Sequence, residues 1–479
     1  MDYKVKSSMK YFFLVTSAII LLTSCSKDVV KQIPQKFPSE INVYFNKDAD
    51  TTYAFPNNKA NFNVNFEDVL INRINKASST IDMMAYEINL PRLINTLINR
   101  ASDGIQIRFI IDAKSYDEEL VDDTLTVERY TLMRLYLEKM NRGKDMKIGT
   151  DDDIMLLSDS PIFTVTDTTL RKKYDLPTSY EDYENVNLKI GNKAISGNLL
   201  VDAERKPDCS DCYYSPGSQM HNKFAIIDTQ WVFTGSWNYT VTGLYGTEED
   251  MKRGNLNGNQ NHVIEIRDRQ LASIYLTEFE EMWGTNQFLP DPGSAKFHTR
   301  KKDNTEHIID INGSRVEVYF SPSDNVLDKI TETVEREVTR SVYFTIFAFS
   351  YQPLVDVLKV KWEGSIEDMQ GIRTDFDLKG IFDASFWNQW WSASINMTGR
   401  TPSRTSELHP MRRWKNPAPV YRDREARKLH AKTMIIDEGI VIVGSANWSE
   451  NADSENDENT LIIYDRFIAN QFMQEFRKR

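Results

Sequence analysis

One segment of this 479-residue chain occurs twice with the same internal spacing, and this repeat constrains the fold more than any other feature. The stretch "HNKFAIIDTQWVFTGSWNYT" begins at His221, and "HAKTMIIDEGIVIVGSANWS" begins at His430. Each copy contains a histidine, a lysine, an aspartate and a Gly-Ser-x-Asn turn. The apolar run before each aspartate is typical of a buried strand, in which residues two apart share a face. We therefore expect the histidine and lysine of each copy to point the same way.

The rest of the chain is also built twice. A strand pattern at Ile41–Asn46 returns at Val316–Pro322, and each is followed by a helical pattern and then by a buried strand. Later in each half, a strand ends in Asp-Ala, at Asp112 and Asp383. Each half closes on a strand and a helix with aromatic residues four apart, namely Phe279 with Trp283 and Phe472 with Phe476. The alternation of strands and helices predicts an α/β layered fold in each half, and the repeat indicates an internal duplication.

Composition divides the chain into regions. We expect a first domain at residues 40–285, with an acidic insertion at 116–218 ahead of the first motif. Residues 286–314 are polar and broken by proline and glycine, which predicts a linker. Residues 315–479 then form the second domain.

The first 25 residues differ from the rest of the chain. Lysines precede a short apolar run that ends in Leu-Thr-Ser-Cys at Cys25, which is the pattern of a signal peptide. The run is too short for a comfortable membrane-spanning helix. Its end resembles a bacterial lipobox, in which Cys25 would carry the lipid that anchors the mature protein in the bacterial cell envelope, on the periplasmic or surface face. The alternative is a plain secretory signal with an incidental cysteine.

The remaining cysteines, Cys209 and Cys212, form a C-x-x-C pair. In an exported protein this pair predicts a local disulfide. A zinc site would need two further ligands, and a redox-active pair would need a context that the neighbouring residues do not resemble.

Two histidines, two lysines and paired Ser/Asn donors suit attack on a phosphodiester. One histidine can attack phosphorus while the other protonates the leaving oxygen, and the lysines and donors can hold the charged oxygens without a metal. An aspartate bonded to an imidazole can fix its tautomer. The side chains expected in such a site are His221, Lys223, Asp228, His430, Lys432 and Asp437, supported by Ser236, Asn238, Ser445 and Asn447.

The pair of H-x-K-x-x-x-x-D motifs resembles the signature of the phospholipase D superfamily. The resemblance implies two similar α/β/α sandwich domains related by a pseudo-twofold axis, with one active site at their interface. It also implies a two-step reaction through a phosphohistidine, without a metal or cofactor. Carried over, His221 and His430 are nucleophile and general acid, Lys223 and Lys432 bind phosphate, and the two motif aspartates orient or anchor their motifs.

One element of the family pattern is uneven between the halves. The family often has an acidic residue and an asparagine shortly after the Gly-Ser turn, and the second half supplies Glu458 and Asn459. The matching stretch of the first half offers Gln260 and Asn261. If the acidic residue orients a histidine, only one of the two histidines has such a partner, and the two histidines then have unequal roles. By analogy with members whose first motif attacks, we expect His221 to be the nucleophile.

The motif does not fix the substrate. "FWNQWW" at residues 386–391 suits a bilayer interface or ordinary core packing. Residues 411–432 hold eight basic side chains against two acidic ones, which suits nucleic-acid phosphates, an anionic lipid headgroup or a solvated face. The net charge of −12 argues against a nuclease.

We therefore expect a membrane-anchored phospholipase D-like enzyme that acts on the phosphatidyl group of phospholipids and releases phosphatidic acid. One alternative is a metal-independent endonuclease that acts on DNA or RNA. The other is a catalytically silent surface binding protein, against which the intact His, Lys and Asp of both motifs argue. The sequence leaves headgroup preference and oligomeric state open.

Overall fold

The computed structural model describes residues 40–112, 124–179, 182–190, 193–209, 211–214, 217–367, 376–401 and 412–479. All of them belong to one unit, Pro38–Arg479, which has its own hydrophobic cores, as an independently folding domain does. The expected signal segment and the lipidation site Cys25 lie outside the described residues.

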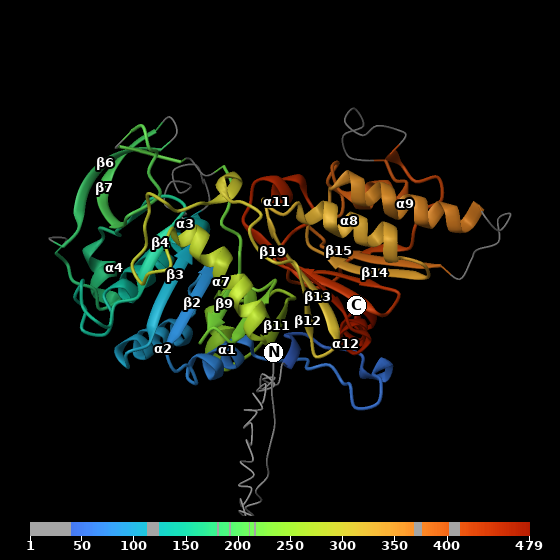
Figure 1. Ribbon diagram of the computed structural model, residues 1–479, viewed down its shortest axis with the longest axis horizontal. Coiled ribbons are helices and arrows are strands. Elements are labelled where there is room, and N and C mark those ends of the chain that lie inside the picture. Colours follow the sequence, from blue (N-terminus) through green and yellow to red (C-terminus); the bar gives the residue numbers. More distant parts are fainter. Residues whose placement is uncertain are drawn as a thin grey trace, which may run out of the picture. The chain divides into compact units, whose positions relative to one another are not determined.

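The first half of the chain builds a seven-stranded sheet (Figure 1). Only the pairs β2–β3 and β3–β4 are parallel, and the other strand pairs are antiparallel. In spatial order the strands are β1 (Glu40–Phe45), β11 (His262–Arg267), β10 (Trp231–Gly235), β9 (Phe224–Ile227), β2 (Thr80–Ala85), β3 (Gln106–Ile111) and β4 (Met155–Ser158).

The second half repeats this sheet strand for strand and adds one strand at the edge. Its central strands are apolar runs buried on both faces, as in "KTMII" and "IVIVG". In spatial order the strands are β12 (Ile308–Ile311), β13 (Ser314–Ser321), β19 (Glu458–Tyr464), β18 (Ile440–Gly444), β17 (Lys432–Ile436), β14 (Ser341–Ile346), β15 (Asp377–Phe382) and β16 (Val420–Arg422). This equivalence confirms the expected α/β fold with two similar halves.

Three pairs of helices also correspond between the halves. The corresponding pairs are α1 (Phe66–Ile74) and α8 (Val326–Glu337), α2 (Pro91–Ser102) and α9 (Gln352–Glu367), and α7 (Arg269–Trp283) and α12 (Arg466–Lys478). The shorter helices are η1 (Thr51–Tyr53), α5 (Val241–Leu244), α6 (Glu248–Arg253), η3 (His298–Arg300), α10 (Ala393–Thr398) and α11 (Glu450–Ser454). Local sequence sets the ends of α7, because Asp268 caps its first turn and Gly284 ends it in the left-handed region at φ +82°.

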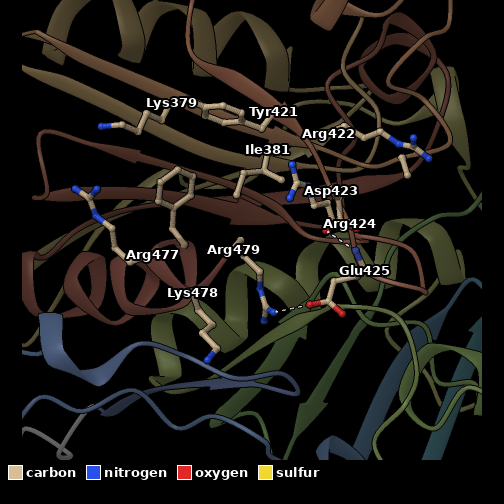
Figure 2. A pocket seen from close by; sticks show the side chains of 12 residues that line it. Lys379, Ile381, Tyr421, Arg422, Asp423, Arg424, Glu425, Arg477, Lys478 and Arg479 are labelled. Carbon is tan, nitrogen blue, oxygen red and sulfur yellow. Dashed lines mark hydrogen bonds and ion pairs between the residues drawn. The ribbon is translucent and has the colours of Figure 1, made fainter.

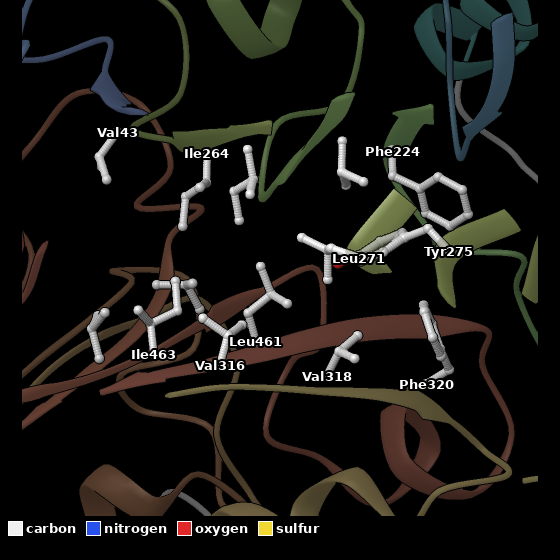
Figure 3. Packing of buried hydrophobic residues seen from close by; sticks show 14 of the residues in the cluster. Val43, Phe224, Ile264, Leu271, Tyr275, Val316, Val318, Phe320, Leu461 and Ile463 are labelled. Carbon is white, nitrogen blue, oxygen red and sulfur yellow. The ribbon is translucent and has the colours of Figure 1, made fainter. Parts of the chain in front are cut away.

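A single hydrophobic core joins the two halves. It gathers side chains of β1, β11 and α7 from the first half with those of β13, β19 and α12 from the second (Figure 3). The rings of Phe45 and Phe472 meet edge to face at 5.0 Å, and those of Tyr275 and Phe320 meet at 5.1 Å. Separate cores fill the space between each sheet and its outer helices. Because the halves share this buried apolar surface, the strand ends of one half are held in a fixed position relative to those of the other.

The acidic insertion begins later than residue 116. Helix α3 (Thr124–Asn141) leads into β4, which pairs with β3 and is an integral strand of the first sheet. The inserted part follows β4 and contains α4 (Thr168–Lys173) and a sheet of β5 (Ile162–Phe163), β7 (Lys193–Val201), β6 (Glu184–Ile190) and β8 (Cys212–Tyr213). Cys209 and Cys212 are joined in a disulfide beside β8, as the C-x-x-C spacing predicts.

The expected linker also contains part of the second sheet. Strand β12 lies within residues 286–314 and pairs with β13 as the edge strand. Before it, Lys301 donates hydrogen bonds to Glu278 of α7 and to the carbonyl of Ser321 at the end of β13. The linker is therefore tied into both halves. Throughout the described ranges, we find no helix with the length and apolar character needed to span a bilayer.

Candidate active site

Each motif places its histidine and lysine immediately before or at the start of a central strand. His221 and Lys223 precede β9, while His430 precedes β17, which begins at Lys432. All four side chains are buried. In each motif the lysine Nζ donates to the carbonyl of the histidine two residues earlier, at 2.8 Å for Lys432 and His430. The histidine and lysine of each motif are thus linked through the histidine backbone.

The backbone of each motif histidine is held by the opposite half. The His221 N–H donates to the carbonyl of Asp457 at 2.9 Å, and the His430 N–H donates to the carbonyl of Gln260 at 2.9 Å. Asp457 and Gln260 precede the last strands of the second and first halves, β19 and β11. This reciprocal exchange brings the two motifs together at the junction between the halves.

The side chains of the two histidines have different partners. His221 Nδ1 lies 2.8 Å from Glu458 Oε2, which belongs to the second half. His430 Nδ1 lies 2.9 Å from the carbonyl oxygen of Ser236 and 3.0 Å from Asn261 Oδ1, both in the first half. One imidazole therefore has a carboxyl partner and the other has only neutral acceptors.

The strand register corrects the expected alignment of Glu458–Asn459 with Gln260–Asn261. Ser236 N donates to the carbonyl of His262, and Ser445 N donates to that of Asn459. His262 is therefore the equivalent of Asn459, and Asn261 is the equivalent of Glu458. Sequence comparison missed this one-residue offset because a longer polar loop precedes the strand in the first half.

Burial sets the electrostatics of the site. It raises the pKa of Glu458 to about 8, against the opposing effect of Lys223. It lowers the pKa of His430 well below the ordinary 6.5, and the charges of Lys432 and Lys223 lower it further. Burial also lowers the pKa of Lys432, with Lys223 as the next contribution. These cations lie close enough to repel one another, so an anion between them would relieve the repulsion.

The serines of the Gly-Ser-x-Asn turns form hydrogen bonds with residues at or next to the start of the neighbouring strands β11 and β19. Ser236 Oγ donates to Asn261 Oδ1 at 3.0 Å, and Ser445 Oγ accepts from Asn459 N at 3.0 Å. Ser236 thereby holds Asn261, which contacts His430, and Ser445 holds Asn459 beside Glu458, while the expected phosphate contacts of the two serines stay a prediction. The side-chain carbonyl oxygens of Asn238 and Asn447 are buried without a hydrogen-bond partner among the described residues.

The motif aspartates occupy the far ends of β9 and β17. The carboxylate of Asp228 accepts backbone N–H groups of residues 78–80, and that of Asp437 accepts those of residues 339–341. Both residues have left-handed backbone, at φ 52° and 51°. A strand of this length separates each aspartate from its histidine by roughly 20 Å. These contacts support anchoring, which is one of the two roles expected for the aspartates, and they place neither carboxylate beside a motif histidine.

Sequence reasoning missed an aromatic residue beside each histidine. The ring of Tyr86 lies 4.7 Å from that of His221, and the ring of Phe347 lies 5.0 Å from that of His430. Each ring also lies near the lysine of its motif, with Lys432 Nζ 5.0 Å from Phe347. Their position in the sequence could have identified them, because each aromatic residue directly follows one of the equivalent strands β2 and β14.

Two further carboxylates position the motifs. Asp112 Oδ2 accepts the N–H of Met220 at 2.9 Å, and Asp383 Oδ2 accepts that of Leu429 at 2.8 Å. Met220 and Leu429 directly precede the motif histidines. The repeated Asp-Ala strand ends were visible in the sequence, but their contact with the motifs depends on the sheet.

One group of potential metal ligands occurs among the described residues, away from the motifs. Ligand atoms of Asp303, His307 and Asp324 lie within 4.8 Å of one another near β12 and β13. His307 already contacts the carbonyl of Val318 through Nδ1 and Asp303 through Nε2, both at 3.0 Å.

Two imidazoles, two lysines and a buried carboxyl partner from opposite halves thus meet in one site. A family model described as "Cardiolipin synthase, PLD-like domain" matches residues 206–283 and 315–479. The chain belongs to the phospholipase D superfamily.

Individual relatives match shorter segments. A phospholipase D of Rickettsia felis is 38% identical over 74 residues, which are 15% of this chain and 36% of that protein. A mitochondrial cardiolipin hydrolase of Xenopus tropicalis is 37% identical over 59 residues, 12% of this chain and 28% of that protein. The matched segments thus span only about a third of each relative.

Among solved structures, the phosphatidylserine synthase of Haemophilus influenzae is similar over most of the fold. The superposition has a TM-score of 0.50 and covers 92% of this chain and 87% of that chain, at 11% sequence identity. At this identity the likeness concerns the fold, and it extends over both halves and their junction.

Proposed function

We propose that this protein is a phosphodiesterase of the phospholipase D type that cleaves or transfers the phosphatidyl group of phospholipids. The observation that carries the proposal is the unequal pairing of two buried histidines across the junction, His221 with Glu458 and His430 with Asn261. Phospholipid as the substrate class is supported by the names of the relatives, phospholipase D and cardiolipin hydrolase.

His221 is the nucleophile in this proposal. Because its Nδ1 contacts Glu458, attack on phosphorus uses Nε2. A bond forms between this nitrogen and phosphorus as the bond from phosphorus to the leaving alcohol breaks. His221 attacks as the neutral tautomer with its proton on Nδ1, which donates to the ionised Glu458, and this carboxylate stabilises the positive charge that develops on the imidazole of the phosphohistidine.

His430 is the general acid. Its neutral partners do not stabilise an imidazolium as a carboxylate would, so its proton is readily given to the leaving oxygen. The bound phosphodiester anion between Lys223 and Lys432 offsets the depressed pKa and lets His430 hold that proton in the complex. In the second step His430 accepts a proton from water, and the hydroxide attacks the phosphohistidine to release phosphatidic acid. An alcohol in place of water would give transfer.

The proposed location is the bacterial cell envelope, with the enzyme anchored through a lipid on Cys25. This rests on the Leu-Thr-Ser-Cys sequence alone. Radiolabelled fatty acid or glycerol should enter the full chain in a bacterial host, and Cys25→Ala should remove the label. Label retained by that variant would contradict lipidation at this residue.

The substrate class is tested with the chain that begins at Pro38. The protein is incubated with phosphatidylcholine, phosphatidylglycerol, cardiolipin, and single-stranded and duplex DNA, each with and without EDTA, and products are scored by mass. Phosphatidic acid formed in the presence of EDTA is expected. Cleaved DNA with intact lipid would assign the same histidines to a nuclease, and binding without any product would favour a silent binding protein.

A further inference from the structure

A hollow of about 970 Å³ lies in the second half, away from the two histidines (Figure 2). It is formed by β15, the segment from β16 toward the second motif, and the end of α12. Ile381, Ala384, Phe476 and the ring of Tyr421 give it apolar lining. Basic side chains from all three segments also line it, namely Lys379, Arg422, Arg424, Arg477, Lys478 and Arg479. The hollow therefore combines apolar surface with positive charge.

Part of this positive charge is not neutralised by the protein. Arg479 is paired with Glu475 at 3.0 Å and with Glu425 at 3.3 Å, and Lys379 is paired with Asp377. Arg422 and Arg424 are exposed and form no ion pair within the described ranges. Asp423 and Glu425 are the acidic side chains of the lining. In a chain of net charge −12, this concentration of cations is a local exception.

The chain segment with charged residues that lines the hollow continues toward the second motif. Residues 421–428 are exposed except for Asp423, and they also carry Arg427 and Lys428. Lys428 Nζ lies 5.4 Å from the ring of Phe347, which packs against His430. A second hollow of about 320 Å³ shares Glu425 with the first and reaches Gln260, whose carbonyl holds the His430 N–H. The chain that lines the hollow therefore carries basic residues up to Lys428, two positions before His430.

We propose that the 970 Å³ hollow binds the headgroup of an anionic phospholipid of the bilayer and thereby orients the active site toward the membrane surface. An amphiphile with a phosphate suits a basic rim over apolar lining. Ile381 and Ala384 add aliphatic surface to the lining, which suits a lipid, whereas a single-stranded nucleic-acid site commonly relies on aromatic faces. Tyr421, 55% exposed, supplies an aromatic side chain of the kind found at bilayer interfaces. The role in orientation rests on the proposed function, whereas lipid binding does not.

Binding is tested by sedimentation with vesicles of phosphatidylcholine alone and of phosphatidylcholine mixed with phosphatidylglycerol, at low and high salt. The test variant is Arg422→Gln/Arg424→Gln. The control is Lys172→Gln/Lys173→Gln, which removes the same charge from exposed positions on α4 of the insertion. We expect the test variant to lose about tenfold in affinity for the anionic vesicles at low salt, and the control to keep it. Equal binding of the unaltered chain to both vesicle types would overturn the proposal.

Turnover of monomeric dihexanoylphosphatidylcholine separates this inference from the proposed function. The test variant should hydrolyse this soluble lipid at the unaltered rate while losing turnover on anionic vesicles. No turnover of any lipid, with anionic-vesicle binding retained and dependent on the two arginines, would remove the phospholipase proposal but support the binding site. Arginine-dependent binding of a single-stranded oligonucleotide without preference for anionic vesicles would overturn the lipid assignment.

Discussion

Glu458 of the second half contacts Nδ1 of His221 in the first half at 2.8 Å, while the equivalent residue of the first half, Asn261, contacts Nδ1 of His430 at 3.0 Å. The duplicated fold thus provides two matching positions and fills them with different chemical groups. A carboxyl group stabilises positive charge on an imidazole and an amide oxygen does so far less. This difference gives two otherwise equivalent histidines separate roles.

The first prediction concerns this pair. Glu458→Gln keeps the size of the side chain but removes the negative charge, so kcat should fall by about 10²-fold or more. The pH profile of kcat on monomeric lipid should also lose the limb that Glu458 contributes. A variant with unchanged kcat and pH profile would show that the carboxyl group does not assist His221. Asn261→Gln serves as a matched control, because it retains a neutral amide beside His430.

The second prediction concerns the covalent intermediate. His430→Asn removes the group that protonates the leaving oxygen and activates water, so a substrate with a good leaving group should form phosphohistidine that hydrolyses slowly. Mass spectrometry of rapidly quenched protein should find the adduct in the peptide that contains His221. His221→Asn should form none. An adduct on His430 in the His221 variant would reverse the assignment.

The third prediction concerns the motif aspartates. Asp228→Ala removes an acceptor that holds the backbone N–H groups of residues 78–80, so the free energy of unfolding should fall by about 1–3 kcal/mol. The rate per folded molecule should stay within a few-fold of the unaltered enzyme, since the carboxylate lies far from phosphorus. Urea unfolding and turnover at low temperature measure both quantities. A catalytic role would instead reduce the rate with little change in stability.

The fourth prediction concerns the glycines of the two turns. A Cβ at Gly235 would lie 2.3 Å from the carbonyl oxygen of His262, and one at Gly444 would lie 2.1 Å from that of Asn459. Either Gly→Ala change should cost about 3 kcal/mol or more, because backbone atoms of the adjacent strand must move. Gly364→Ala in α9 is the control, since nothing lies within 4 Å of its Cβ and alanine favours the helix. Thermal unfolding should show a lower midpoint temperature for the Gly235 and Gly444 variants than for the Gly364 control.

The fifth prediction concerns His298 in the connection between the halves. Its largely buried side chain lies beside Asp457 and Asp159, with Nδ1 2.9 Å from Asp457 Oδ2. Burial lowers its pKa, but the two carboxylates outweigh that effect and raise it to about 10. Because the folded state holds this proton more tightly, its contribution to stability is fully present below about pH 6.5 and is lost as the pH rises to about 10.

His298→Gln tests this assignment. The free energy of unfolding of the unaltered chain should decline across the interval from about pH 6.5 to 10, and the variant should show a flatter profile over that interval. Urea titrations at several pH values measure both curves. Parallel curves for the two proteins would mean that His298 does not hold a charge in the folded state.

Much of the architecture could be predicted because it depends on local patterns. Apolar runs of strand length and helical spacing gave the order of elements in both halves, and the repeated motifs identified His221, Lys223, His430 and Lys432 as side chains to be brought together. The boundaries of the insertion and the linker were harder to predict, since β4 and β12 are short strands in polar surroundings. Each becomes a strand by pairing with a neighbour that is distant in sequence or lies across a turn.

The sequence by itself determined the duplicated α/β fold and the chemical groups of the site, because periodicity and residue type are properties of neighbouring residues. Only the tertiary structure decided which groups meet. Glu458 contacts the histidine of the other half, the motif aspartates lie away from the histidines, and basic side chains from three separate segments line one hollow. These relationships arise from packing two sheets around a shared core, which fixes distances between residues more than two hundred positions apart.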